Sequence, residues 1–277
     1  MQFLRPGQIR DRLKQFPVVY IPFGPLEWHG PHLPYGMDPL NAENVAGCAC
    51  ERTGGVVWPT QYWGTERDRR PETNKSLGFP VDQYVVGMDF PAHFLPSLYC
   101  PEEVFGILLR DLLRQVITLG AKAAILVNGH GAENHIAVFR RLEREFNATS
   151  SLKVLFRYAL MGVEGGEHAG VMETSILMNI RPDAVDLGQL PKKGPLKYTQ
   201  FGIVDAGGFL GMPGPGHALP PREDPRRHAS PALGKKLTDK TVDILVRDVY
   251  ALMKAKKAVR TKKSTVRPRR LVNRRRS

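Results

Sequence analysis

The chain has 277 residues, of which 42% are hydrophobic and 24% are charged, a length and composition that allow a full hydrophobic core and exclude a short peptide. No apolar run reaches the ~20 residues that a membrane-spanning helix needs, so we do not expect an integral membrane protein. The net charge of +13 is concentrated in residues 253–277, which contain twelve Lys or Arg and no acid.

Strands and helices are expected to alternate along the chain. The predicted strands are short apolar runs, and the predicted helices are amphipathic stretches bounded by Pro or Gly. In chain order the pattern predicts a strand at 18–23, a helix at 41–52, a strand at 56–59, a helix at 101–119, a strand at 121–127, a helix at 133–146, a strand at 152–158, and helices at 169–179 and 231–253. This order predicts an α/β protein, with one layered α/β/α domain and a mainly parallel sheet.

Two segments lack the periodicity of a helix or a strand. Residues 61–100 are rich in Gly, Pro and aromatic side chains, and because so long a loop is usually functional, we interpret it as a lid or a pocket wall. Residues 181–216 are also irregular. No linker divides the chain, so we predict one domain over residues 1–253 and a basic, disordered tail over residues 254–277.

The basic tail and the N-terminus bear on partners and location. A run of cations without acids binds anionic partners in a salt-dependent way, but this one lacks the interleaved aromatic side chains that stack on bases. We therefore do not expect a nucleic-acid partner except through the tail, which is more simply interpreted as a disordered, solvated extension. Residues 1–14 lack the hydrophobic stretch of a secretory signal, and three cysteines suit a reducing compartment. We expect a cytoplasmic location and no membrane partner.

The first group of chemically active side chains follows the first predicted strand. Residues 27–34 read EWHGPHLP, and Asp38 comes shortly after. In parallel α/β sheets ligands bind beyond the carboxyl ends of the strands, and mixed carboxylate and imidazole ligands suit Zn, Mn or Fe. Taken singly, Glu27 and Asp38 are as well explained as capping or salt-bridging groups, and His29 and His32 as loop residues. As a cluster, these residues indicate a metal site.

A second motif follows the strand predicted at 121–127. Residues 128–134 read NGHGAEN, which places His130 at the ligand-binding edge of the sheet. Asn128 is suited to orient its neighbours by hydrogen bonds. The alternative is a plain strand-to-helix turn, with Glu133 as a first-turn acid favoured by the helix dipole.

A third motif follows the strand predicted at 152–158. Residues 164–175 read EGGEHAGVMETS, with His168 in a loop and Glu173 near the start of a helix. A histidine with a pKa near neutrality beside a metal-bound water is a natural proton shuttle. The alternative makes His168 a turn residue and Glu173 a surface acid.

Together the three motifs resemble the creatininase (creatinine amidohydrolase) family. The family's first signature, E-Q-H-G-P-H-L-P followed by an Asp, appears at residues 27–38 with Trp28 in place of the Gln. The family's N-G-H-G-G-N turn matches residues 128–131, and its H-A-G-x-x-E-T-S motif matches residues 168–175 in full. The similarity spans about residues 18–253, and the order and spacing of the motifs make it specific.

The resemblance implies a set of site residues. Carried over position by position, the metal ligands are Glu27, His29, Asp38 and His130, with Asp38 bridging two ions, and His168 is the catalytic acid/base. Creatininases place a further ligand Glu two residues after the motif His, where this chain has Ala132. Glu173 is then the better candidate for the last carboxylate ligand, and the choice between it and Glu133 stays open. The residues left as candidates for supporting the ligands or contacting substrate are His32, Asn128 and Glu133.

The resemblance also implies a function. Two divalent ions (Zn, Mn or Fe) activate a hydroxide that attacks the carbonyl or amidine carbon, and the C–N bond of a small amide, cyclic amide or formamide then breaks, with His168 as the proton shuttle. The resemblance also implies a protein that forms homo-oligomers. Creatinine itself is a doubtful substrate, because creatininases follow the motif His with Tyr and this chain has Gly131. The alternative is a non-catalytic relative that binds a small molecule or, through its tail, an anionic partner.

Overall fold

A parallel four-stranded sheet organises the protein. The computed structural model describes residues 1–76, 80–89, 95–163, 167–194, 196–198, 217–218 and 224–254. The strands are β1 (Val18–Phe23), β2 (Val56–Val57), β3 (Ala123–Asn128) and β4 (Lys153–Tyr158). Their order is β2-β1-β3-β4, and every pairing is parallel. Phe23, Asn128 and Tyr158 end their strands in one row, so the loops that follow leave the sheet at one edge.

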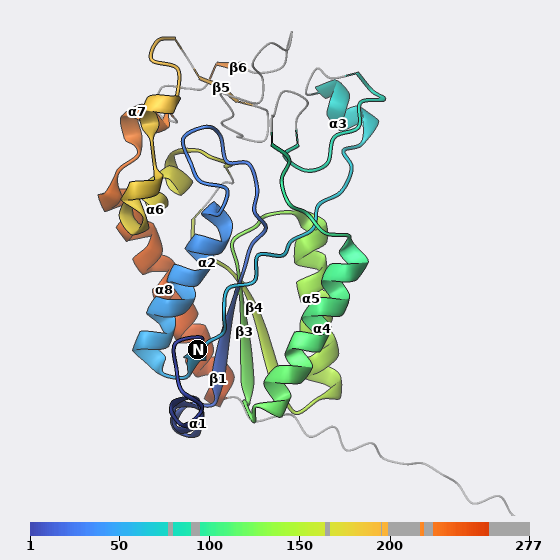
Figure 1. Ribbon diagram of the computed structural model, residues 1–277, viewed down its shortest axis with the longest axis vertical. Coiled ribbons are helices and arrows are strands. Elements are labelled where there is room, and N and C mark those ends of the chain that lie inside the picture. The colour runs from blue at the N-terminus through green and yellow to red at the C-terminus, as the bar shows by residue number, and fades with distance from the viewer. Residues whose placement is uncertain are drawn as a thin grey trace, which may run out of the picture.

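Helices cover both faces of the sheet (Figure 1). One face packs against α4 (Glu102–Thr118) and α5 (Glu133–Thr149), and the other against α2 (Met37–Thr53) and α8 (Pro231–Lys254). Because side chains alternate along a strand, Ile21 lies in the first core and Tyr20 in the second. The predicted α/β/α layering is confirmed.

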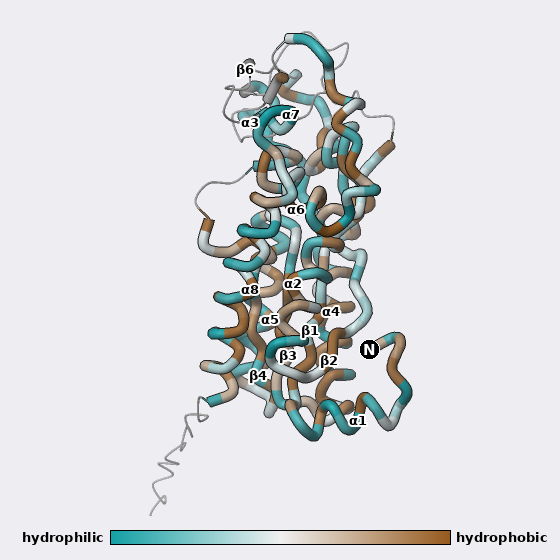
Figure 2. Tube along the Cα trace, turned by 90° about the vertical axis from the view of Figure 1, so that its left-hand side faces the viewer, coloured by the Kyte–Doolittle hydropathy of each residue, from teal (hydrophilic) through white to brown (hydrophobic). Residues whose placement is uncertain are grey.

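The remaining elements lie at the two ends of the sheet. They are α1 (Pro6–Gln15), α3 (Pro71–Ser76), α6 (Val171–Ile180), the short 3-10 helices η1 (Pro182–Ala184) and η2 (Leu187–Gln189), β5 (Lys197–Tyr198), β6 (His217–Ala218) and α7 (Pro225–His228). In the perpendicular view, α1 lies at the end opposite to α3, α7 and β6 (Figure 2). The sequence patterns missed α1 and α3, which are short.

Two predicted boundaries were wrong in ways that matter. The helix predicted from residue 41 begins at Met37, because Pro39 is tolerated within a first helical turn; Asp38 thus belongs to the helix. The strand predicted at 56–59 is only Val56–Val57, and it stops short of Pro59, which has no N–H to donate to a neighbouring strand. The predicted tail, apart from Lys254 at the end of α8, lies outside the described residues.

At the outer edge of β4, side chains form hydrogen bonds with backbone groups that no described strand pairs with. Asn147 of α5 accepts from the N–H of Val154 at 2.9 Å and donates to its carbonyl at 2.8 Å. Glu143 accepts from the N–H of Phe156 at 3.0 Å, and Arg157 donates to the Phe156 carbonyl at 2.8 Å. These bonds occupy backbone groups that an edge strand otherwise offers to another chain.

No helix in the described part of the chain has the length and apolar character needed to cross a membrane.

Candidate metal centre

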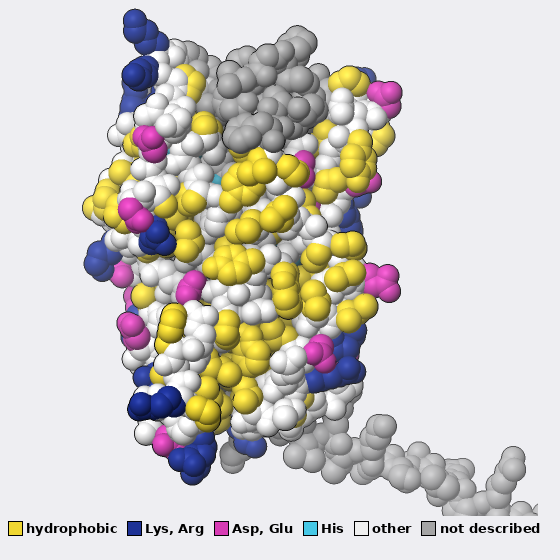
Figure 3. Space-filling model, in the orientation of Figure 1, with side chains coloured by type: hydrophobic (Ala, Val, Ile, Leu, Met, Phe, Trp, Pro, Cys, Tyr) yellow, Lys and Arg dark blue, Asp and Glu magenta, His cyan; other side chains and the backbone are white. Residues whose placement is uncertain are grey.

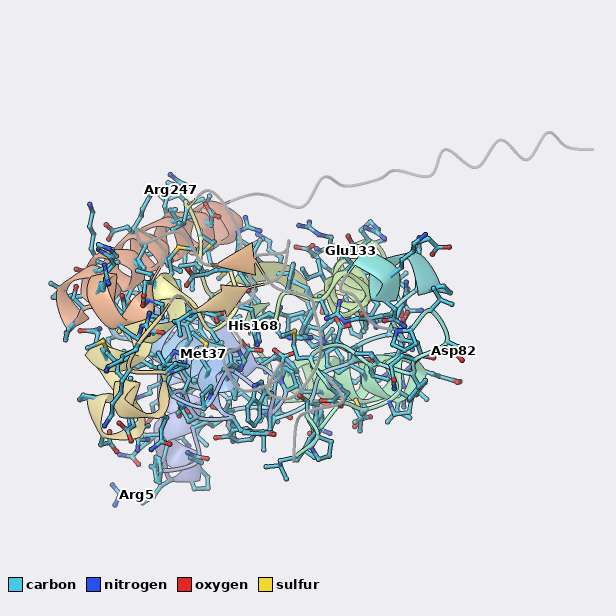
Figure 4. All side chains as sticks on the ribbon, turned by 90° about the horizontal axis from the view of Figure 1, so that it is seen from above. Arg5, Met37, Asp82, Glu133, His168 and Arg247 are labelled. Atoms are coloured by element: carbon cyan, nitrogen blue, oxygen red, sulfur yellow. The ribbon has the colours of Figure 1, made fainter. Side chains whose placement is uncertain are left out.

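A cavity of about 370 Å³ opens at the carboxyl ends of the strands. It is lined by Glu27, Asp38, Glu66, Arg69, Gly87, Met88, His130, Gly131, Ala132, Glu133, Tyr158, Glu167, His168 and Glu173. The view from above shows His168 near the middle of the molecule and Glu133 over α5 (Figure 4). All three sequence motifs therefore reach one cavity, and the described part of residues 61–100 supplies part of its wall, as the sequence predicted.

Two glycines allow the strand ends to close around Asp38. A Cβ atom on Gly129 would lie 2.2 Å from the Asp38 carbonyl oxygen, and a Cβ on Gly24 would lie 2.7 Å from the Asp38 Cβ. Only glycine permits such close backbone approach. The turns after β1 and β3 thereby hold the first turn of α2 between them, which brings Asp38 into the cavity.

Among the described residues, three overlapping groups have the spacing of metal ligands. Glu27, Asp38 and His130 make one group, His29, Asp38 and Glu173 make the second, and Glu27, His29 and His168 make the third. The first two consist of the five residues expected as ligands. Asp38 Oδ1 lies 3.3 Å from His29 Nε2, and Asp38 Oδ2 lies 3.3 Å from His130 Nδ1. Asp38 is the member that the first two groups share.

The donor set fits a pair of divalent ions. His29 Nε2 and Asp38 Oδ2 are buried and have no hydrogen-bond partner among the described residues, although buried polar atoms are normally paired. His29 Nδ1 donates to the backbone carbonyl of Glu27 at 3.0 Å, and this bond directs Nε2 toward the carboxylates, as in many metal-binding histidines. Carboxylate and imidazole ligands together suit Zn or Mn.

The charges of the cluster are strongly coupled. Burial alone would lower the pKa of His29, but the carboxylates around it raise that pKa to about 10. Burial raises the pKa of Glu173 to about 8, against the opposing effect of His29. Burial opposes the charge of Asp38 too, yet His29 and His130 hold its pKa well below the usual range. In the metal-free protein, protons on His29 and Glu173 therefore offset negative charge that bound cations would otherwise offset.

His168 lies against the cluster with one nitrogen toward it. Its Nε2 donates to the backbone carbonyl of Trp28 at 2.6 Å, and its Nδ1 lies 4.0 Å from Glu27 Oε2. Because a carbonyl only accepts, Nε2 carries the proton and Nδ1 keeps its lone pair. Burial and the neighbouring His29 lower the pKa of His168 to about 4. His168 is thus a neutral base, and with Glu27 and His29 it also lies within ligand distance of a common point.

The start of α6 fixes Glu173. Its Oε2 accepts from the backbone N–H of Ala169 at 2.6 Å. Ala169 has φ of 55°, a left-handed conformation seen at no other non-glycine residue in the described parts of the chain. Glu167 accepts from the N–H groups of Met172 and Glu173. A strained backbone conformation of this kind persists only where surrounding contacts hold it, and here the bond between the Ala169 N–H and Glu173 is one such contact.

The three supporting candidates lie in different places. His32 contacts Thr174 Oγ1 at 3.0 Å, so it ties its loop to α6 and does not join the cluster. Asn128 accepts from the His130 N–H at 3.2 Å and donates to the His130 carbonyl, which stabilises the turn. Glu133 is exposed on the cavity wall and belongs to neither ligand group, whereas Glu173 does.

The sequence patterns missed several residues that support the site. Tyr99 donates to Glu27 Oε1. Glu66 Oε1 lies 4.0 Å from His130 Nε2. His135 accepts from the Thr65 N–H at 3.3 Å and contacts Asn128 Oδ1 at 2.9 Å. A buried polar side chain in an aperiodic segment or a helix carries no local signal, so only the packing reveals these contacts.

Comparison with known proteins identifies the family. Residues 3–249 match the creatininase family, described as creatinine amidohydrolase. The chain belongs to the creatininase family. It is 24% identical over 208 residues to the creatinine amidohydrolase of Pseudomonas putida, covering 67% of this chain and 73% of that protein. It is 26% identical over 239 residues to 2-amino-5-formylamino-6-ribosylaminopyrimidin-4(3H)-one 5'-monophosphate deformylase of Methanothermobacter thermautotrophicus, covering 83% of this chain and 86% of that protein.

Solved structures agree on the fold. A crystal structure of creatinine amidohydrolase matches with a TM-score of 0.66 at 22% identity, covering 92% of this chain and 98% of that one. A manganese form of creatininase and a variant described as Zn-Zn type each match with a TM-score of 0.65 over the same shares of the two chains. The creatininase-like fold predicted from the motifs is confirmed, and the protein is a hydrolase of this family.

Proposed function

We propose that this creatininase-family protein is a dinuclear metal-dependent amidohydrolase that cleaves a C–N bond of a small amide, cyclic amide or formamide. The observation that carries the proposal is the pair of ligand groups that share Asp38. Divalent ions held by Glu27, His29, Asp38, His130 and Glu173 would supply Lewis acidity, which polarises a carbonyl and lowers the pKa of water.

His168 is the proton carrier in this proposal. Its Nε2–H is committed to the Trp28 carbonyl, so Nδ1 is the atom that accepts a proton from the attacking water. The same atom then delivers the proton to the leaving nitrogen. The short bond to Trp28 holds the ring in place through both transfers, since it is made by the nitrogen that does not exchange the proton.

The cavity wall restricts the substrate. Glu66, Glu133 and Arg69 line the cavity beside the ligand groups, so a substrate meets both acceptors and a donor there. Arg69 is itself fixed by a bond to the Gly87 carbonyl at 2.7 Å. A small polar substrate with several N–H groups suits this wall, and formamides and cyclic amides are of that kind. Gly131 lines the cavity without a side chain, and a Cβ atom there would lie 3.4 Å from the Tyr158 hydroxyl oxygen.

Metal analysis tests the proposal. The protein as purified is expected to hold two Zn, Mn or Fe ions per chain, and Asp38→Ala, which removes the shared ligand, is expected to hold none. A panel of cyclic amides and formamides is then assayed with the metal found. A wild-type protein that binds no metal after reloading contradicts the hydrolytic mechanism and leaves a small-molecule binding protein on the same fold as the better description.

We also propose that the protein is a homo-oligomer. Hydrophobic side chains gather on the face shown in Figure 3. Large apolar side chains that are exposed in the described chain include Phe3, Leu98, Val104 and Ile107. Extended apolar surface favours association with another protein surface. Light scattering coupled to size-exclusion chromatography tests this, and a monomer at all concentrations contradicts it.

A further inference from the structure

The two ligand groups are supported by different parts of the chain. The group of His29, Asp38 and Glu173 is supported by the Glu27 carbonyl, which accepts from His29, and by the Ala169 N–H, which donates to Glu173. The group of Glu27, Asp38 and His130 receives Tyr99 and Glu66, which come from the aperiodic segment before α4. This difference gives the two ion positions separate determinants.

Tyr99 fixes the carboxylate of Glu27 in this second group. Its hydroxyl donates to Glu27 Oε1 and accepts from the N–H of Met88 at 3.2 Å. The other oxygen, Glu27 Oε2, lies 3.3 Å from His130 Nδ1 and farther, at 3.8 Å, from His29 Nε2 of the other group. A carboxylate with one oxygen occupied by a buried hydroxyl presents the second oxygen in a fixed direction. Tyr99 thus selects which oxygen of Glu27 faces the ion position.

Glu66 faces Nε2 of His130, the nitrogen that points away from Glu27 and Asp38. His130 Nδ1 points at Glu27 and Asp38, so Nε2 must carry the proton when Nδ1 holds an ion. His130 Nε2 is buried without a hydrogen-bond partner in the described structure, and Glu66 Oε1 lies 4.0 Å away. This distance is within the range of an ion pair but is too long for a direct hydrogen bond. Metal-bound histidines normally donate their second N–H to such a carboxylate.

The backbone holds Glu66 next to His130. Thr65 is fully buried, and its backbone N–H donates to His135 Nδ1 at 3.3 Å. Glu66 Oε2 accepts from the N–H of Arg67 at 3.2 Å, which leaves Oε1 for His130. The segment that forms the cavity wall therefore also contacts both outer ligands of one ion position.

We propose that Tyr99 and Glu66 are positioning residues that set the affinity of the ion position made by Glu27, Asp38 and His130, and do not affect the position made by His29, Asp38 and Glu173. This inference rests on the proposed function, since it requires two ions per chain. It assigns to the cavity wall a second role, the retention of one ion of the pair.

The experiment measures metal affinity and not turnover. Wild-type protein, Tyr99→Phe and Glu66→Gln are stripped with a chelator and titrated with Mn²⁺ in competition with a chromophoric chelator, and electron paramagnetic resonance distinguishes a single Mn²⁺ from a coupled pair. Tyr35→Phe is the matched control for the first variant, because it removes a hydroxyl bonded only to the Leu95 carbonyl among the described contacts. Asp68→Asn, an exposed carboxylate on the same segment, is the control for the second.

The expected result is asymmetric. In Tyr99→Phe and Glu66→Gln one ion binds as in the wild type and the other binds roughly 10 to 100 times more weakly, the usual cost of losing a partner of a metal ligand. The coupled signal then gives way to that of a single Mn²⁺ at intermediate metal concentrations. The two controls bind both ions as the wild type does.

Two results overturn the inference. If a wild type with two ions has variants whose two affinities are both unchanged or both reduced equally, the inference is wrong and the proposed function stands. If the wild type itself binds no Mn²⁺, Zn²⁺ or Fe²⁺, both the proposed function and the inference are wrong. Because both substitutions are nearly isosteric, circular dichroism of the stripped variants is expected to match the wild type, and Glu66→Gln decides the matter if Tyr99→Phe does not fold.

Discussion

Substitution of Gly129 by Ala tests how the strand ends position Asp38. The new Cβ atom would lie 2.2 Å from the Asp38 carbonyl oxygen and 2.7 Å from its Cα. An ordinary carbon–oxygen contact is longer by roughly 1 Å, so the first turn of α2 must move away by about that amount; such overpacking costs about 1–3 kcal/mol of unfolding free energy. The atoms that collide are backbone atoms, which have no alternative rotamer.

The same displacement moves the shared ligand. Metal sites tolerate only about 0.2 Å of error in ligand distances, so Gly129→Ala is expected to lose affinity for both ions as well as stability. Urea denaturation of the metal-free protein measures the loss of stability, and chelator competition measures the loss of metal affinity. Because Asp38 belongs to both ligand groups, both affinities are expected to fall together, unlike the result expected for Tyr99→Phe.

Gly47 provides the matched control. It lies inside α2, the same helix, and a Cβ atom there meets nothing within 4 Å. Gly47→Ala is therefore expected to raise the unfolding free energy by about 0.5–1 kcal/mol, since Ala favours the helix interior over Gly. A Gly129→Ala variant with wild-type stability and wild-type metal affinity would refute the argument that this close approach positions Asp38.

Four further outcomes are expected. His168→Ala keeps both ions in elemental analysis and loses most turnover; loss of one ion would instead make His168 a ligand. Metal affinity falls as pH is lowered from about 9 to about 6, because the raised pKa of His29, about 10 in the metal-free protein, means that a proton must leave before an ion binds; chelator competition at several pH values measures this, and a flat profile contradicts it. Metal removal by a chelator lowers the unfolding free energy by about 2.7 kcal/mol when the free metal had been about 100 times its dissociation constant, which differential scanning fluorimetry detects as a fall in Tm. Asn147→Ala leaves the backbone N–H and carbonyl of Val154 at the sheet edge without their partner and lowers the unfolding free energy by about 1–2 kcal/mol in urea denaturation, whereas Gln115→Ala, which removes an exposed side-chain hydrogen bond, changes it by less than about 0.5 kcal/mol.

The alternation of apolar runs and amphipathic stretches determined the layered fold. Strands such as residues 123–128 are buried on both faces and read as continuous apolar runs, so their pattern is visible in the sequence. The three motifs follow three strands, and parallel strands end at one edge, so the sequence was enough to predict that His29, His130 and Glu173 meet there. It also indicated that Asp38 lies near the start of the next helix, but it placed that start at residue 41 instead of Met37, because Pro39 obscured the first turn.

Tertiary structure alone decided which polar groups support the cluster. Glu133 and Glu173 look alike in sequence, since each is a first-turn acid after a histidine motif, yet only Glu173 joins a ligand group. Tyr99 and Glu66 come from a segment without periodicity, and their contacts span 72 and 64 residues of sequence to reach Glu27 and His130. Local patterns report the side of a helix or strand that faces the core. They do not indicate which distant side chain will form a hydrogen bond with the free atom of a buried metal ligand, because packing of the whole chain determines that contact.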